Sequence, residues 1–226
     1  MTVSPREKTG VSRGSSSLLD ELGYLFYSGA QVLKKLSTAA IDGYRSFFSV
    51  DSDLRLQYFL DKGIRYTERG RYGQAIAMLD RVLLERPQDV ETLFHLGFCL
   101  LREDRVEEGI ALLTRAEQLD ATDARVSSVL GMAYIQSERY GEAVAMLEKA
   151  LVGNPENFNL HYRLGLAYDK MADYDKALDS FQMAGRLRPK EPKVYQSIGF
   201  ILEQQGKRDE AVDYFKRAMQ LAEGRS

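Results

Sequence analysis

The chain has 226 residues, of which 44% are hydrophobic, so it can bury a sizeable core. Its formal net charge of -2, with 28% charged residues, excludes a global field that would attract nucleic acid or an anionic membrane. A single cysteine, Cys99, excludes an internal disulfide and a cysteine metal cage, and is compatible with a reducing cytoplasm.

The first segment, residues 1–16, is rich in serine and basic residues but has no apolar run of signal-peptide length. Its composition predicts a flexible tail, and we expect no export. The apolar stretch at residues 18–36 is interrupted by polar and basic residues, whereas a membrane-spanning helix needs about 20 mainly apolar residues. We therefore expect a soluble protein that is at most peripheral on a membrane.

The second segment, residues 17–55, begins with Ser17 followed three residues later by Asp20, which is typical of a helix N-terminus. Apolar spacing after it predicts a helix with a wide apolar stripe. The segment either caps the repeats that follow or docks onto another copy of the chain, and the two roles are compatible. The predicted stripe consists of Leu18, Leu22, Leu25, Phe26, Val32, Leu33 and Leu36.

From Leu56 onward the sequence repeats with a period of 34 residues, as GRYGQAIAMLDRVL, ERYGEAVAMLEKAL and ADYDKALDSFQMAG show. Glycine always occupies position 8 of the unit, where two helices are expected to approach too closely for a side chain. Apolar residues spaced by three and four predict two helices per unit, separated by a polar turn near position 15. The five units span residues 56–89, 90–123, 124–157, 158–191 and 192–225.

This pattern resembles the tetratricopeptide-repeat (TPR) family across residues 56–225. The resemblance implies an all-α fold, a right-handed TPR superhelix or α-solenoid of helix-turn-helix repeats. Residues 22–55, one period upstream, carry Gly29 at position 8 but Ile41 and Arg45 at later core positions. We therefore expect five full repeats preceded by one degenerate N-terminal repeat.

The resemblance also implies a concave groove lined by the first helix of each unit. Positions 5 and 9 would form an apolar floor that suits a docked helix or apolar peptide, and positions 2 and 6 would add charges that change from acidic or neutral to basic along the chain. The floor consists of Leu60, Ile64, Phe94, Phe98, Met132, Tyr162, Leu166 and Phe200. The charged and polar set includes Gln57, Asp61, Glu91, Arg125, Arg163 and Lys193, and its basic end favours binding of an acidic segment.

Residues for catalysis are few. His95 and His161 lie in different repeats without a nucleophile motif, and the glycines occur singly rather than in a phosphate loop. We expect His161 to be a packing residue and Cys99 a small core residue. The sequence therefore predicts no enzyme activity, no cofactor or metal, and no nucleic-acid partner.

Several short stretches are more specific than the repeat consensus: FFSVDSDLR at residues 47–55, DKGI at 61–64, GRY at 70–72, and NPENFN followed by RLG. They are similar to the magnetosome-associated TPR proteins of the MamA family. That resemblance implies a cytoplasmic scaffold, peripheral on the magnetosome membrane and linked to biomineralization. It also implies a head-to-tail homo-oligomer, in which residues 17–55 occupy the groove of a neighbour, and recruitment of magnetosome membrane proteins by peptide or helix docking.

The resemblance further implies two subdomains, residues 56–123 with repeats 1–2 and residues 124–226 with repeats 3–5. Their junction lacks the proline that ends repeats 1, 3 and 4. We therefore expect a hinge at Ala121, Thr122, Asp123 and Ala124. The alternative interpretation of the whole chain is a generic cytoplasmic TPR adaptor for another complex, such as a secretion or pilus assembly machine.

Overall fold

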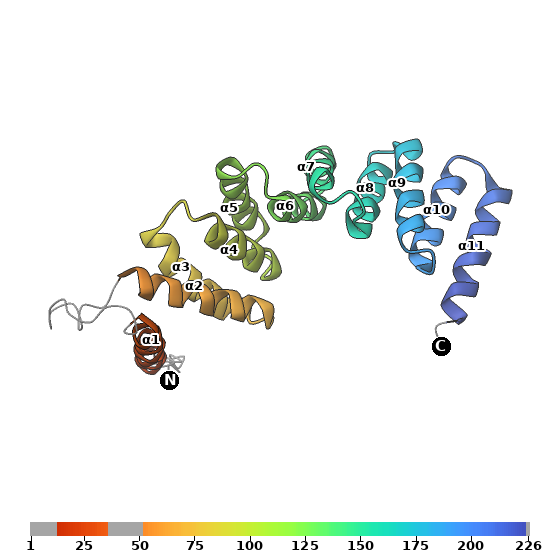
Figure 1. Cartoon of the computed structure of the whole chain (residues 1–226). Coiled ribbons are helices and arrows are strands. Elements are labelled where there is room, and N and C mark those ends of the chain that lie inside the picture. Colours follow the sequence, from red (N-terminus) through yellow and green to blue (C-terminus); the bar gives the residue numbers. More distant parts are fainter. Residues whose placement is uncertain (1–12, 36–51, 225–226) are drawn as a thin grey trace, which may run out of the picture.

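The computed structural model describes residues 13–35 and 52–224, which form eleven α-helices and no strand (Figure 1). The first helix, α1, spans Arg13–Lys35. Ten further helices follow as five pairs: α2 (Ser52–Glu68) with α3 (Tyr72–Glu85), α4 (Val90–Arg102) with α5 (Val106–Leu119), α6 (Ala124–Gln136) with α7 (Tyr140–Gly153), α8 (Phe158–Lys170) with α9 (Tyr174–Leu187), and α10 (Pro192–Gln204) with α11 (Arg208–Glu223).

Each pair is one 34-residue unit, and each unit packs on the next. The second helix of a pair contacts the first helix of the following pair, and first helices also contact each other, as α2 with α4, α4 with α6 and α6 with α8. Figure 1 shows the pairs following one another from α2 to α11, with the two ends of the array far apart. The predicted TPR solenoid is confirmed.

Small residues at fixed repeat positions bring the two helices of a pair into close contact. In the third repeat, Ala143 and Ala150 are fully buried with Leu147 between them, and equivalent residues are buried in the first, second and fourth repeats. A Cβ atom added at Gly131 of α6 would lie 2.6 Å from Cγ of Leu147. The glycine at position 8 is therefore required by the close packing of α6 on α7.

The turn between the helices of each pair has a left-handed residue at position 15. Its φ angle is positive in all five repeats, at Gly70, Asp104, Glu138, Ala172 and Gly206. In each case the next residue donates its N–H to a carbonyl five residues earlier, such as Asp173 to Tyr168 at 2.9 Å, which completes a Schellman-type helix end. The sequence predicted a polar turn here but not this conformation, because three of the five residues are not glycine.

Helix α1 differs from its prediction in extent and in packing. It begins at Arg13 rather than at Ser17, so residues 13–16 belong to the helix and not to the tail. A Cβ atom on Gly29 would meet nothing within 4 Å, so this glycine does not mark a close helix contact. The close approach lies instead at Gly23, whose added Cβ would be 2.3 Å from the hydroxyl of Tyr58 on α2.

We predict that Gly131→Ala lowers the free energy of unfolding by about 1–3 kcal/mol, because the new methyl group overlaps the fully buried Leu147 side chain. The matched control is Gly141→Ala in α7, whose Cβ would meet nothing within 4 Å. That substitution should be neutral or stabilise the protein by up to about 1 kcal/mol, since alanine favours helix over glycine. Urea unfolding followed by circular dichroism measures both, and equal effects would contradict the role assigned to position 8.

Candidate protein-interaction groove

Helix α1 meets the first repeat through polar and aromatic contacts. Asp20 forms an ion pair with Lys62 of α2, and the Tyr27 hydroxyl donates to Asp61 at 2.8 Å. Tyr24 is 2% exposed and packs edge-on against Tyr58, with ring centroids 6.0 Å apart. One face of α1 therefore covers the start of the repeat array.

Lys62 is the one polar residue at position 7 of the repeat, where the other repeats have leucine or isoleucine, and its contacts with α1 explain the difference. That position faces the preceding unit, and here the preceding unit supplies Asp20 and the hydroxyl of Tyr58 stands 3.1 Å away. Partial burial acts to lower the pKa of Lys62, but the hydrogen bonds to Asp20 and Tyr58 outweigh it and the pKa is raised. The lysine is therefore a charged partner for α1.

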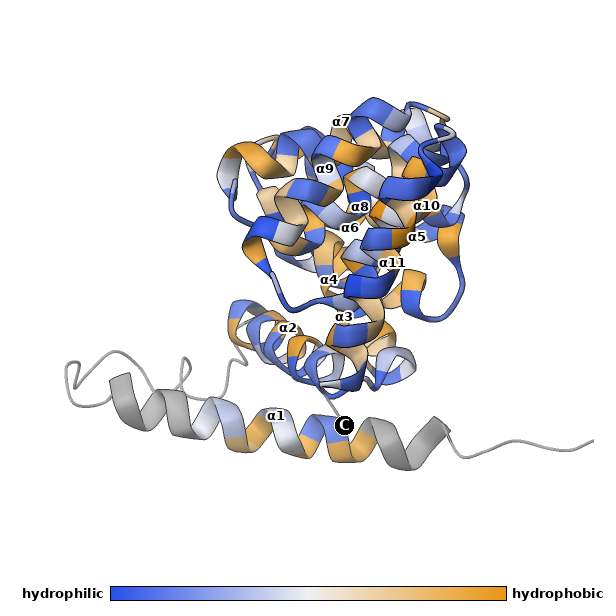
Figure 2. Cartoon of the chain, turned by 90° about the vertical axis from the view of Figure 1, so that its right-hand side faces the viewer, coloured by the Kyte–Doolittle hydropathy of each residue, from blue (hydrophilic) through white to orange (hydrophobic). Residues whose placement is uncertain are grey.

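The opposite face of α1 is apolar and exposed. Leu18, Leu22, Leu25 and Phe26 have exposed fractions of 67%, 50%, 53% and 81%. Figure 2 shows the hydrophobic residues of α1 along the side turned away from the helix pairs. The side chains of Val32 and Leu33, and the whole of Leu36, lie outside the described residues. An exposed apolar stripe of this kind marks an interaction surface.

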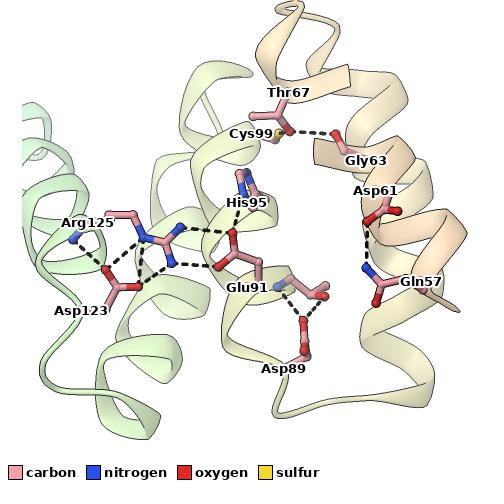
Figure 3. Close-up of polar contacts among 11 residues, drawn as sticks. Gln57, Asp61, Gly63, Thr67, Asp89, Glu91, His95, Cys99, Asp123 and Arg125 are labelled. Atoms are coloured by element: carbon pink, nitrogen blue, oxygen red, sulfur yellow. Dashed lines mark hydrogen bonds and ion pairs between the residues drawn. The ribbon is translucent and has the colours of Figure 1, made fainter. Parts of the chain in front are cut away.

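The predicted groove residues lie on the first helices of the repeats, and the face that these helices share is called the inner face below. On this face a charge cluster joins the second and third repeats (Figure 3). The guanidinium group of Arg125 on α6 donates to both carboxylate oxygens of Glu91 on α4, at 3.2 and 2.8 Å, and also to Asp123 at 2.8 Å. These hydrogen bonds from Arg125 lower the pKa of Glu91 and of Asp123. His95 lies 3.0 Å from Glu91 through Nε2, and burial lowers its pKa, so the imidazole is neutral at pH 7.

Three of the predicted hinge residues lie between α5 and α6, and the fourth, Ala124, is the first residue of α6. One of the four, Asp123, takes part in this cluster. Asp123 accepts a hydrogen bond from the backbone N–H of Arg125 at 2.8 Å and thereby caps α6. Asp120 accepts from the backbone and the hydroxyl of Thr122, at 2.9 and 2.7 Å. Ala121 and Thr122 are exposed and Ala124 is half-buried.

The predicted apolar floor is mostly present but is more buried than expected. Ile64, Phe94, Phe98, Met132, Tyr162 and Leu166 are half-buried and Phe200 is 51% exposed. Leu60 is only 8% exposed and belongs to the core of the first repeat, so it adds little to an open surface. Gln57 is exposed and donates to Asp61 at 2.8 Å.

The basic residues of the groove have different environments. Arg125 is engaged by Glu91 and Asp123, whereas Lys193 at the start of α10 is exposed. Arg163 on α8 is half-buried, and its guanidinium lies 3.5 Å from the sulfur of Met132. The sequence analysis grouped Arg125, Arg163 and Lys193 as basic groove residues and did not distinguish their three environments.

Other expected features can be placed. Cys99 is fully buried and its sulfur lies 3.1 Å from the hydroxyl of Thr67, and burial raises the pKa of the thiol. His161 is half-buried with Nε2 2.8 Å from the carbonyl of Pro155.

In residues 13–35 and 52–224, no group of three or more histidine, cysteine or acidic residues could hold a metal ion. No helix in those ranges is long and apolar enough to cross a membrane.

Comparison with known proteins assigns the repeats to a protein family. Tetratricopeptide-repeat models match residues 66–133, 134–198 and 192–224. "Magnetosome protein MamA" of Magnetospirillum gryphiswaldense is 41% identical over 87 residues, which cover 38% of this chain and 40% of that protein. MamA of Paramagnetospirillum magneticum is 40% identical over the same extent. The sequence match therefore spans well under half of these relatives.

Solved structures match over a longer range. A MamA structure from strain MSR-1 has a TM-score of 0.73 and 39% identity, covering 76% of this chain and 99% of that one. A MamA structure from strain AMB-1 has a TM-score of 0.71 and 41% identity, covering 77% and 95%. The helix pairs, their period and these matches define a tetratricopeptide-repeat protein, the class whose repeats serve protein interaction. Within that class, the chain belongs to the MamA family.

We predict that Arg125→Gln lowers the free energy of unfolding at pH 7 by about 1 kcal/mol, the upper end for solvent-accessible ion pairs. Because Arg125 lowers the pKa of Glu91 and Asp123 in the folded protein, its contribution is complete above their ordinary values of 4.5 and 3.8. It is lost as the pH falls further, through their lowered values. The difference between variant and parent should therefore shrink on acidification.

Urea unfolding from pH 7 to pH 3 measures this difference. The matched control is Arg105→Gln, which removes an ion pair with Glu108 of the same repeat rather than an ion pair between repeats. An Arg125→Gln deficit that stays constant across the pH range would contradict the assignment of the cluster.

Proposed function

We propose that this chain is a self-assembling scaffold on the cytoplasmic face of the magnetosome membrane, where it recruits other magnetosome proteins. The exposed apolar stripe of α1 carries the proposal, because an amphipathic helix anchored by its polar face can dock its other face elsewhere. Membership of the MamA family supports the assignment to the magnetosome. The repeat array offers the inner face as a second surface.

The proposed assembly is head-to-tail. Leu18, Leu22 and Leu25 of one copy would lie on the half-buried aromatic and aliphatic floor of the next copy, including Phe98 and Leu166. Two different patches meet in such a contact, so the assembly need not close and can grow with concentration. A coat of this kind would bind the membrane peripherally.

We predict that Leu22→Lys disperses the assembly, because a charge placed in the apolar contact must be desolvated. The matched control is Val152→Lys on α7, which makes a similar change at a side chain that is 87% exposed and belongs to neither surface. Light scattering against concentration reads the size of the particles. Deletion of residues 1–48 should have the same effect as Leu22→Lys, provided that circular dichroism shows the repeats still folded. Large particles in the deletion would contradict the role given to α1.

The location of the protein separates this proposal from a generic TPR adaptor for a secretion or pilus machine. We predict that the full chain co-purifies with magnetite-containing vesicles and is released by mild alkali or chaotrope, as expected of a peripheral protein. The control is a membrane-spanning magnetosome protein, which should resist that extraction. Fractionation with another complex and absence from the vesicles would favour the adaptor.

We also propose that the junction at residues 121–124 is a joint between repeats 1–2 and repeats 3–5. Its exposed Ala121 and Thr122 can change backbone angles without losing core contacts, while the Glu91–Arg125 bridge sets the resting angle. Identical angles between the second and third repeats in several crystal forms would contradict this joint.

A further inference from the structure

Arg163 is the basic residue of the groove whose environment points to a missing partner. Its side chain is half-buried on α8, and burial lowers the pKa of the guanidinium group. The nearest polar atom recorded for it is the sulfur of Met132, at 3.5 Å, and no carboxylate of residues 13–35 and 52–224 lies within ion-pair distance. A partly buried charge without an opposite charge is unfavourable, so a ligand that supplies a carboxylate would stabilise it.

The surroundings of Arg163 suit such a ligand. Leu166, one turn along α8, provides apolar surface, and Tyr162 beside it places its hydroxyl 3.4 Å from that of Ser197 on α10. At the same repeat position, the neighbouring repeats have Val129 and Ser197, which carry no charge. The site is therefore a single cation bordered by apolar and hydroxyl groups.

The exposed face of α1 has the complementary arrangement. Glu21 lies three residues after Leu18 and four before Leu25, so it borders the apolar stripe on the helix surface. It is exposed at the edge of a hollow that Arg55 and Arg81 of its own chain also line, whereas Asp20 is already paired with Lys62. A docked α1 can thus offer one carboxylate beside its leucines.

We propose that Glu21 of a second copy forms an ion pair with Arg163 when the apolar stripe of its α1 lies on the groove floor. This inference rests on the proposed self-assembly and adds to it the residue pair that fixes the position of α1 along the groove. Apolar contact alone allows α1 to slide along the floor, whereas a charge pair in a partly desolvated site selects one position.

Charge reversal in the full chain tests the pair. Arg163→Glu and Glu21→Arg should each raise the concentration needed for half-maximal assembly by about tenfold, since breaking a desolvated charge pair leaves the other charge unpaired. The double variant should return the midpoint to within about threefold of the parent, because the ion pair re-forms with the two charges exchanged. Sedimentation velocity gives the midpoint, and thermal unfolding confirms that each variant is folded.

The control is Lys207→Glu, which makes the same kind of change at an exposed lysine before α11, outside the groove residues, and should shift the midpoint much less. If Leu22→Lys disperses the assembly but Arg163→Glu does not, the pair is overturned and the proposed self-assembly stands. If both single reversals disperse it and the double variant stays dispersed, Arg163 binds another acidic group and the pair is again overturned. If Leu22→Lys leaves the assembly intact, the proposed function fails and this inference with it.

Discussion

The close contact between the two helices of each repeat is the constraint on which the structure depends. Gly131 and its equivalents leave no room for a side chain at the crossing, and leucine or phenylalanine from the second helix fills the space. Since the contact recurs every 34 residues, the core extends as a strip rather than closing into a globule. The first helices α2, α4, α6 and α8 contact one another in succession, so they line a common face of that strip.

The N-terminal end of the strip of repeats is covered by α1, through a contact that differs from those between repeats. Another apolar repeat could have covered it, but the contact is made by Asp20 with Lys62 and by tyrosines. This polar and aromatic contact leaves the leucines of α1 on the outside. One helix can therefore cover its own array and still present an apolar face to another molecule, which is why capping and docking are compatible.

The two arginines of the predicted groove differ in whether carboxylates of the described residues satisfy them. Arg125 is held by two carboxylates across the junction of the second and third repeats, so it contributes to the shape of the array rather than to ligand binding. Arg163 has no such partner among the described residues and is half-buried. Electrostatic recognition in this groove is accordingly expected at the fourth repeat.

The sequence by itself determined the repeat, its period, the two helices per unit and the buried small residues, because these depend on contacts between neighbouring residues and helices that recur with the period. Tertiary structure decided three things that the pattern did not contain. Ala172 adopts a left-handed turn because the helix end it closes requires it, whatever its side chain. Arg125 meets Glu91, 34 residues away, and Lys62 meets Asp20, 42 residues away. Such pairs depend on the rotation between successive units and on side-chain direction, and a one-dimensional pattern fixes neither.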